Sequence, residues 1–198
     1  MNKELDLKEL EKKVWLTYFQ DGFWDIFIAS MMLTMAIRTL TDNVWFTLGM
    51  FTGVPILVIG KKFITIPRLG HVKFSQFRMK RQIRLMATIG IAVCATVGFL
   101  LLISMGWDAP KVISSLGMAV FLALIFGLIA YFLEFPRLFI YGLMFATNEI
   151  IWGHFGEPTG PYVVLIFGST VLVIGLIILA SFIRKYPLPK EEEIPNAL

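Results

Sequence analysis

Charged residues and cysteine are both scarce in this sequence. Charged residues make up only 16% of the chain and hydrophobic residues 57%, with a mean hydropathy of +0.76, outside the usual range for soluble domains. Cys94 is the single cysteine, which excludes a disulfide within the chain and a cysteine-based metal cluster. A water-soluble fold could not bury this much apolar surface, so the composition indicates an integral membrane protein.

Motifs for catalysis and cofactor binding are also absent. The sequence contains no glycine-rich phosphate loop, no G-x-S-x-G elbow and no H-E-x-x-H helix. The two histidines, His71 and His154, fall on opposite sides of the membrane in the layout that hydropathy predicts, which argues against a histidine metal centre. We therefore expect no cofactor and no metal ion, and we favour a non-enzymatic protein.

Long apolar runs alternate with short polar breaks along the 198 residues. This pattern predicts an all-α, polytopic transmembrane helix bundle of about six spans, forming a single membrane domain over residues 1–198. The predicted spans are about 22–40, 44–60, 83–105, 112–132, 137–152 and 162–183. Residues 5–19 have the spacing of an amphipathic interfacial helix, and residues 186–198 form a polar tail.

The first predicted span follows a local break in the helical pattern. Asp21 and Gly22 end the amphipathic helix, and Asp21 is available to cap the helix that begins next. The thirteen N-terminal residues mix acids and bases, unlike the short positive region of a cleavable signal peptide. We expect the first span to remain in the mature protein.

Residues 61–84 form the most basic stretch of the chain, with eight of the eighteen Lys and Arg residues and no acid. Because loops rich in Lys and Arg stay on the cytoplasmic side, we predict a cytoplasmic loop over 61–82, with a small hairpin turning at 67–70. Both termini are then cytoplasmic, in the inner or plasma membrane. Sixteen basic residues lie inside, and only Arg38 and Lys111 lie outside.

The basic stretch has a functional interpretation as well as a topological one. Its side chains could hold anionic lipid head groups or the phosphate of a ligand. The candidates are Arg68, His71, Lys73, Arg78, Lys80, Arg81 and Arg84. The simpler interpretation is that these charges only orient the chain, which also explains the net charge of +4 without a nucleic-acid partner.

Glu149 is an acid within a predicted span. It shares a helix face with Gly142 and Ala146, so its carboxylate should point into the bundle, with Asn148 and His154 as candidate polar neighbours. An acid inside a membrane is costly and is a functional candidate for that reason. The alternative is that Glu149 lies at the outer interface in contact with water.

Asp25 lies about one turn inside the cytoplasmic end of the first span, where the helix dipole favours a carboxylate. Two interpretations are open. Asp25 and Glu149 could be the two ends of a cation or proton path, or Asp25 could pair with a Lys or Arg of the basic loop. Elsewhere, small residues spaced by four predict close helix contacts: Gly49 with Gly53; Gly90, Cys94 and Gly98; and Ala119, Ala123 and Gly127.

The stretches DGFWDIF, ITIPRLGHVKF and RKYPLP resemble signatures of a family of small, uncharacterised, polytopic prokaryotic integral membrane proteins. The resemblance spans most of the chain. It implies a prokaryotic plasma-membrane setting, but no activity and no functional residues.

Three classes of function remain open. The first is a small transporter-like component or the membrane subunit of a larger complex, with protein subunits or a second copy as partners in the lipid bilayer. The second is an accessory or scaffold protein that recognises anionic lipid or a cytosolic partner through the basic loop. The third is an intramembrane enzyme acting on a phospholipid, with Asp21 or Asp25 beside that loop.

Overall fold

The described part of the chain is helical. The computed structural model describes residues 14–70, 83–91, 94, 95, 98, 101, 111–156 and 159–188, and these are 90% helical and contain no strand. Four of the described helices are long and apolar enough to cross a membrane: Val14–Thr41, Phe46–Leu69, Ile113–Leu133 and Thr159–Lys185. The predicted class, an all-α membrane protein with several spans, is confirmed.

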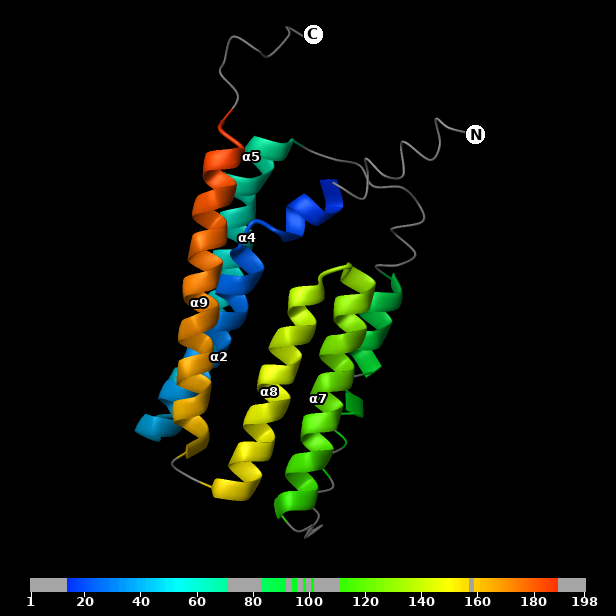
Figure 1. Ribbon diagram of the computed structural model, residues 1–198, viewed down its shortest axis with the longest axis vertical. Helices are drawn as coiled ribbons and strands as arrows, with labels where there is room; N and C mark the ends of the chain where they lie inside the picture. Colours follow the sequence, from blue (N-terminus) through cyan, green and yellow to red (C-terminus); the bar gives the residue numbers. More distant parts are fainter. Residues whose placement is uncertain are drawn as a thin grey trace, which may run out of the picture. The chain divides into compact units, whose positions relative to one another are not determined.

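The chain divides into two units, 1–73 with 165–198 and 74–164. In the first unit the central helix is α2 (Phe23–Thr41), and α4 (Gly53–Gly60) and α9 (Thr159–Lys185) lie beside it (Figure 1). The helical segment that contains α4 is assembled from short elements in chain order. These are α3 (Phe46–Gly49), η1 (Met50–Thr52), α4, η2 (Lys61–Thr65) and α5 (Ile66–Leu69).

The chain bends sharply before α2. Residues 14–19 are helical, and Gly22 then has a φ of 86°, a left-handed conformation that favours glycine. Asp21 Oδ1 accepts a hydrogen bond from the backbone N–H of Phe23 at 3.1 Å. The helix break lies at Asp21 and Gly22, as the sequence predicts. The N-cap residue is Gly22, and Asp21, one position earlier, accepts the first helical N–H.

Glycines allow the helices of the first unit to approach α2 closely. A Cβ atom at Gly60 would overlap the ring of Phe23, and one at Gly53 would overlap the hydroxyl of Ser30. On α9, a Cβ atom at Gly175 would lie 3.0 Å from the Cβ atom of Asp25. Because Gly53 and Gly60 are seven residues apart, they share one helix face, which packs against α2.

The basic stretch begins as a helix rather than as a loop. We expected the second span to end at Gly60 and a hairpin to turn at 67–70, but η2 and α5 continue the helix to Leu69. This expectation is wrong over 61–69. Lys61 is buried and paired with Asp21, and Lys62 is exposed, so a helix can accommodate both lysines at its end.

The second unit contains α7 (Lys111–Leu133) and α8 (Pro136–Phe155), which lie side by side (Figure 1). Gly142 of α8 packs directly on Phe126, whose ring centroid lies 5.3 Å from that of Phe145. At the other expected seam, a Cβ atom at Gly90 or Gly98 would meet nothing within 4 Å among the described residues.

The count of six spans stays a prediction. Helix α8 covers the fifth predicted span but is not among the four helices apolar enough to cross a membrane, since it carries Arg137, Asn148 and Glu149. Of the third predicted span, residues 83–91 are helical, and much of the remainder lies outside the described residues.

Candidate functional site

Asp21 is the centre of a buried hydrogen-bonded cluster in the first unit. Its side chain is fully buried, and Lys61 is only 7% exposed. Asp21 Oδ2 accepts hydrogen bonds from Lys61 Nζ and from Thr65 Oγ1, both at 2.8 Å, while Oδ1 accepts the N–H of Phe23. One carboxylate therefore joins the start of α2 to η2 through a buried ion pair.

The ammonium group of Lys61 makes further contacts with the helical residues 14–19. It donates a hydrogen bond to the backbone carbonyl of Tyr18 and lies 3.9 Å from the centroid of the Tyr18 ring. The ring of Phe19 lies 5.4 Å away. Asp25, also fully buried, is close enough to interact electrostatically with Lys61. Lys61 thus holds three segments together, with its donors directed at protein groups.

The local helix geometry explains why Lys61 and Thr65 reach the same oxygen atom. Residues Lys61–Thr65 form a π-helix, in which the N–H of Ile66 bonds to the carbonyl of Lys61. A proline inside a helix clashes with the carbonyl four residues before it, so Pro67 favours a wider turn just upstream. Residues four apart lie on the same side of such a helix, so Lys61 and Thr65 both face Asp21.

A pocket of about 660 Å³ adjoins the cluster. One wall is aromatic and comes from residues 18–19 and the first turn of α2, and the other is mainly aliphatic and comes from α4 and the elements that follow it. The lining residues are Tyr18, Phe19, Trp24, Leu57, Val58, Lys61, Lys62 and Ile66. None of the described lining residues is acidic. Lys61 is engaged by Asp21, whereas Lys62 is exposed.

The residues proposed for an intramembrane path belong to different units. Asp25 lies in α2, whereas Glu149 is a half-buried residue of α8. Asn148 is 1% exposed, and its Oδ1 atom has no hydrogen-bond partner among the described residues. His154 is exposed, with its ring packed edge-on against Phe155. The path from Asp25 to Glu149 stays a prediction.

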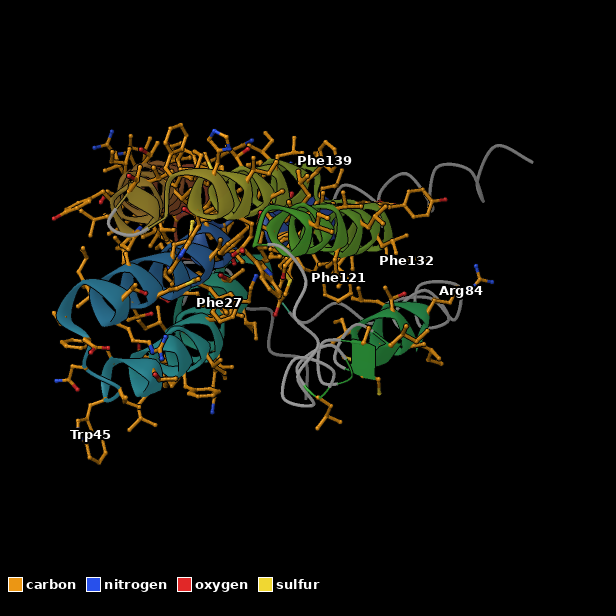
Figure 2. The ribbon with its side chains drawn as sticks, turned by 90° about the horizontal axis from the view of Figure 1, so that it is seen from below. Phe27, Trp45, Arg84, Phe121, Phe132 and Phe139 are labelled. Atoms are coloured by element: carbon orange, nitrogen blue, oxygen red, sulfur yellow. The ribbon has the colours of Figure 1, made fainter. Side chains whose placement is uncertain are left out.

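Only two of the basic candidates fall within the described residues. Arg68 donates a hydrogen bond from Nη1 to the carbonyl of Ile64 at 2.9 Å. Arg84 is exposed on the helical residues 83–91 (Figure 2). The others lie outside the described residues: His71, Lys73, Arg78, Lys80 and Arg81. In the described part of the chain, no three acidic, histidine or cysteine side chains are placed to hold a metal ion.

Comparison of the chain with models of known protein families, with curated proteins and with solved structures gave no match. The helices and the site together define the class of protein. It is a helical membrane protein in which a buried ion pair lies beside an apolar pocket that carries an exposed lysine.

Proposed function

We propose that this protein is a non-enzymatic, multi-pass membrane protein that serves as the membrane subunit of a larger assembly. The proposal rests on one observation. The helices pack closely against one another on one side, but their outer apolar faces are not covered by the chain. Glycines bring α4 and α9 against α2, yet a third or less of the residues in the most apolar stretch of each long helix are buried inside the chain. The uncovered apolar faces suit lipid and the helices of a neighbouring subunit.

The proposed setting is a prokaryotic plasma membrane, with both termini in the cytoplasm. The distribution of positive charge supports this orientation, because sixteen Lys and Arg residues fall on the cytoplasmic side of the predicted layout and two on the other. The protein's polar chemistry at Asp21, Lys61 and Thr65 is internal and mutually satisfied, which suits a structural role.

Native mass spectrometry of the protein, extracted from its membrane in mild detergent, tests the subunit role. We expect the main species to contain a second polypeptide or a second copy of this chain in a fixed ratio. Circular dichroism of the same sample controls for unfolding. A single helical copy that retains only lipid would contradict the proposal.

A second candidate, a small transporter-like component, has support from α8. Asn148 Oδ1 is buried without a partner among the described residues, and the neighbouring Glu149 is half-buried. Buried polar groups of this kind normally find a partner, which in a transporter is an ion, a solute or water.

Neutralisation of Glu149 distinguishes the two candidates. For a membrane subunit, we expect liposomes containing the purified wild-type protein to pass protons and monovalent cations no faster than empty liposomes. We expect Glu149→Gln to assemble with its partner as the wild type does. Flux that the wild type supports and Glu149→Gln lowers at least tenfold would favour the transporter. Asp42→Asn, at an exposed acid beyond the end of α2, is the matched control.

A further inference from the structure

The pocket beside Lys61 has the size and the lining of a ligand site. Its volume of about 660 Å³ lies within the range of about 300–1,000 Å³ that is usual for ligand pockets. Six of the eight described side chains that line it are aromatic or aliphatic. Trp24 and Phe19 stack with their ring centroids 5.9 Å apart, which gives the pocket a flat aromatic wall. Such a lining suits a flexible hydrocarbon chain.

The charged side chains that line the pocket are both positive. Among the described residues, Lys61 and Lys62 are the only charged side chains that line it. Asp21 neutralises Lys61, whereas Lys62 is exposed, with its ammonium 5.8 Å from the centroid of the exposed ring of Phe63. One cationic group at the side of an apolar pocket is therefore left for a ligand of opposite charge.

The position of Lys62 along its helix places that charge near a membrane interface. Phe46 and Lys62 are separated by about 24 Å of helix, and the hydrocarbon layer of a bilayer is about 30 Å thick. Trp45, at the opposite end of this segment, is 77% exposed and projects away from the ribbon (Figure 2). A tryptophan at one end and lysines at the other are typical interfacial anchors, and the Lys62 side chain can extend to the head groups.

We propose that this pocket binds an anionic phospholipid of the surrounding bilayer, with one acyl chain between Trp24 and Val58 and the head-group phosphate on Lys62. Basic pockets between helices at the cytoplasmic side are recognised sites for anionic head groups. The apolar walls favour an acyl chain, and the exposed ammonium of Lys62 favours a negatively charged head group. A lone protein and a subunit of an assembly could both carry this site, so it does not depend on the role proposed above.

Quenching of Trp24 by brominated lipids tests the site. The purified protein is placed in nanodiscs that contain a fixed mole fraction of phosphatidylglycerol or phosphatidylcholine, each brominated on the same acyl chain. The difference in fluorescence between wild type and Trp24→Phe isolates the Trp24 signal. We expect brominated phosphatidylglycerol to quench that signal at least twofold more strongly than brominated phosphatidylcholine. Equal quenching by the two lipids would overturn the proposal.

Three variants distinguish the contribution of the lipid head group from that of the acyl chain. Lys62→Gln should reduce quenching by phosphatidylglycerol to the level of phosphatidylcholine, whereas Lys185→Gln, at an exposed lysine near the end of α9, should not. Val58→Phe, at a side chain that is 58% exposed, should fill the pocket and lower quenching at least twofold. An equal loss in Lys62→Gln and Lys185→Gln would mean general surface attraction, and unchanged quenching in Val58→Phe would exclude a chain in the pocket.

Discussion

Replacing Lys61 with methionine is expected to lower the free energy of unfolding by about 3–5 kcal/mol, because it leaves the Asp21 carboxylate buried without its counter-charge. Methionine keeps most of the apolar volume of the lysine chain, so the loss reports the charge rather than a cavity. Asp21→Asn should lose a similar amount, since it strands the Lys61 ammonium while keeping an oxygen to accept the N–H of Phe23.

The double variant Lys61→Met with Asp21→Asn identifies the cause of this loss. With both charges removed, we expect much of the stability to return, so the coupling energy in a double-mutant cycle should exceed about 2 kcal/mol. Unfolding by sodium dodecyl sulfate in mixed micelles, followed by circular dichroism, measures each value. Lys62→Met, at the exposed neighbouring lysine, should stay within about 0.5 kcal/mol of wild type. Equal losses at both lysines would show that the buried pair has no special role.

Hydropathy and local turn chemistry were sufficient to predict much of the first unit. Asp21 and Gly22 combine a side chain that caps helices with a residue that tolerates a positive φ, and the chain bends at this point. The spacing of Gly49 and Gly53 predicted a close contact, and their positions pack on Thr34 and Ser30 of α2. These signals are local, so they can be read without knowing which segments meet in space.

Residues 61–69 show where local signals mislead. Two lysines, a proline and a glycine within ten residues are typical of a loop, yet the chain stays helical to Leu69. The positive charges are compatible with a helix because Lys61 is paired and Lys62 reaches outward. Pro67 is compatible with it because the π-helical turn of η2 lies just upstream and widens the helix where the proline ring would otherwise clash.

The candidate site could be predicted only in part, because its residues are far apart in the sequence. Asp21 was expected as a cap, but Lys61 and Thr65 lie 40 and 44 residues away, and no periodicity links them to it. In α8, the periodicity placed Gly142 and Ala146 on the buried face, and both are buried. Asn148 and Glu149 follow the buried residues Tyr141 and Gly142 by seven residues each, yet Asn148 is buried and Glu149 is only half-buried, so periodicity did not separate the two.

Gly22→Ala is expected to be the most damaging single change to the packing of α2 on α9, with a loss of about 2–5 kcal/mol. Two effects add at this position. The φ of 86° strains any residue with a Cβ atom, and that atom would lie 2.5 Å from the carbonyl oxygen of Gly175 and 2.8 Å from the backbone nitrogen of Leu179. Backbone atoms of a helix cannot move aside as a flexible side chain can.

Two further variants separate the strain from the overlap. Asparagine tolerates a positive φ but carries a Cβ atom, so Gly22→Asn should remain nearly as unstable as Gly22→Ala if the contact with α9 dominates. Recovery of most of the stability in Gly22→Asn would instead assign the loss to backbone strain. Gly117→Ala, at an exposed helical glycine where a Cβ atom would meet no described residue within 4 Å, should gain up to about 1 kcal/mol in the same detergent titration. We expect the free energy of unfolding to fall in Gly22→Ala and to rise in Gly117→Ala. This result would show that the close approach of α9, rather than the presence of a glycine as such, fixes the start of α2.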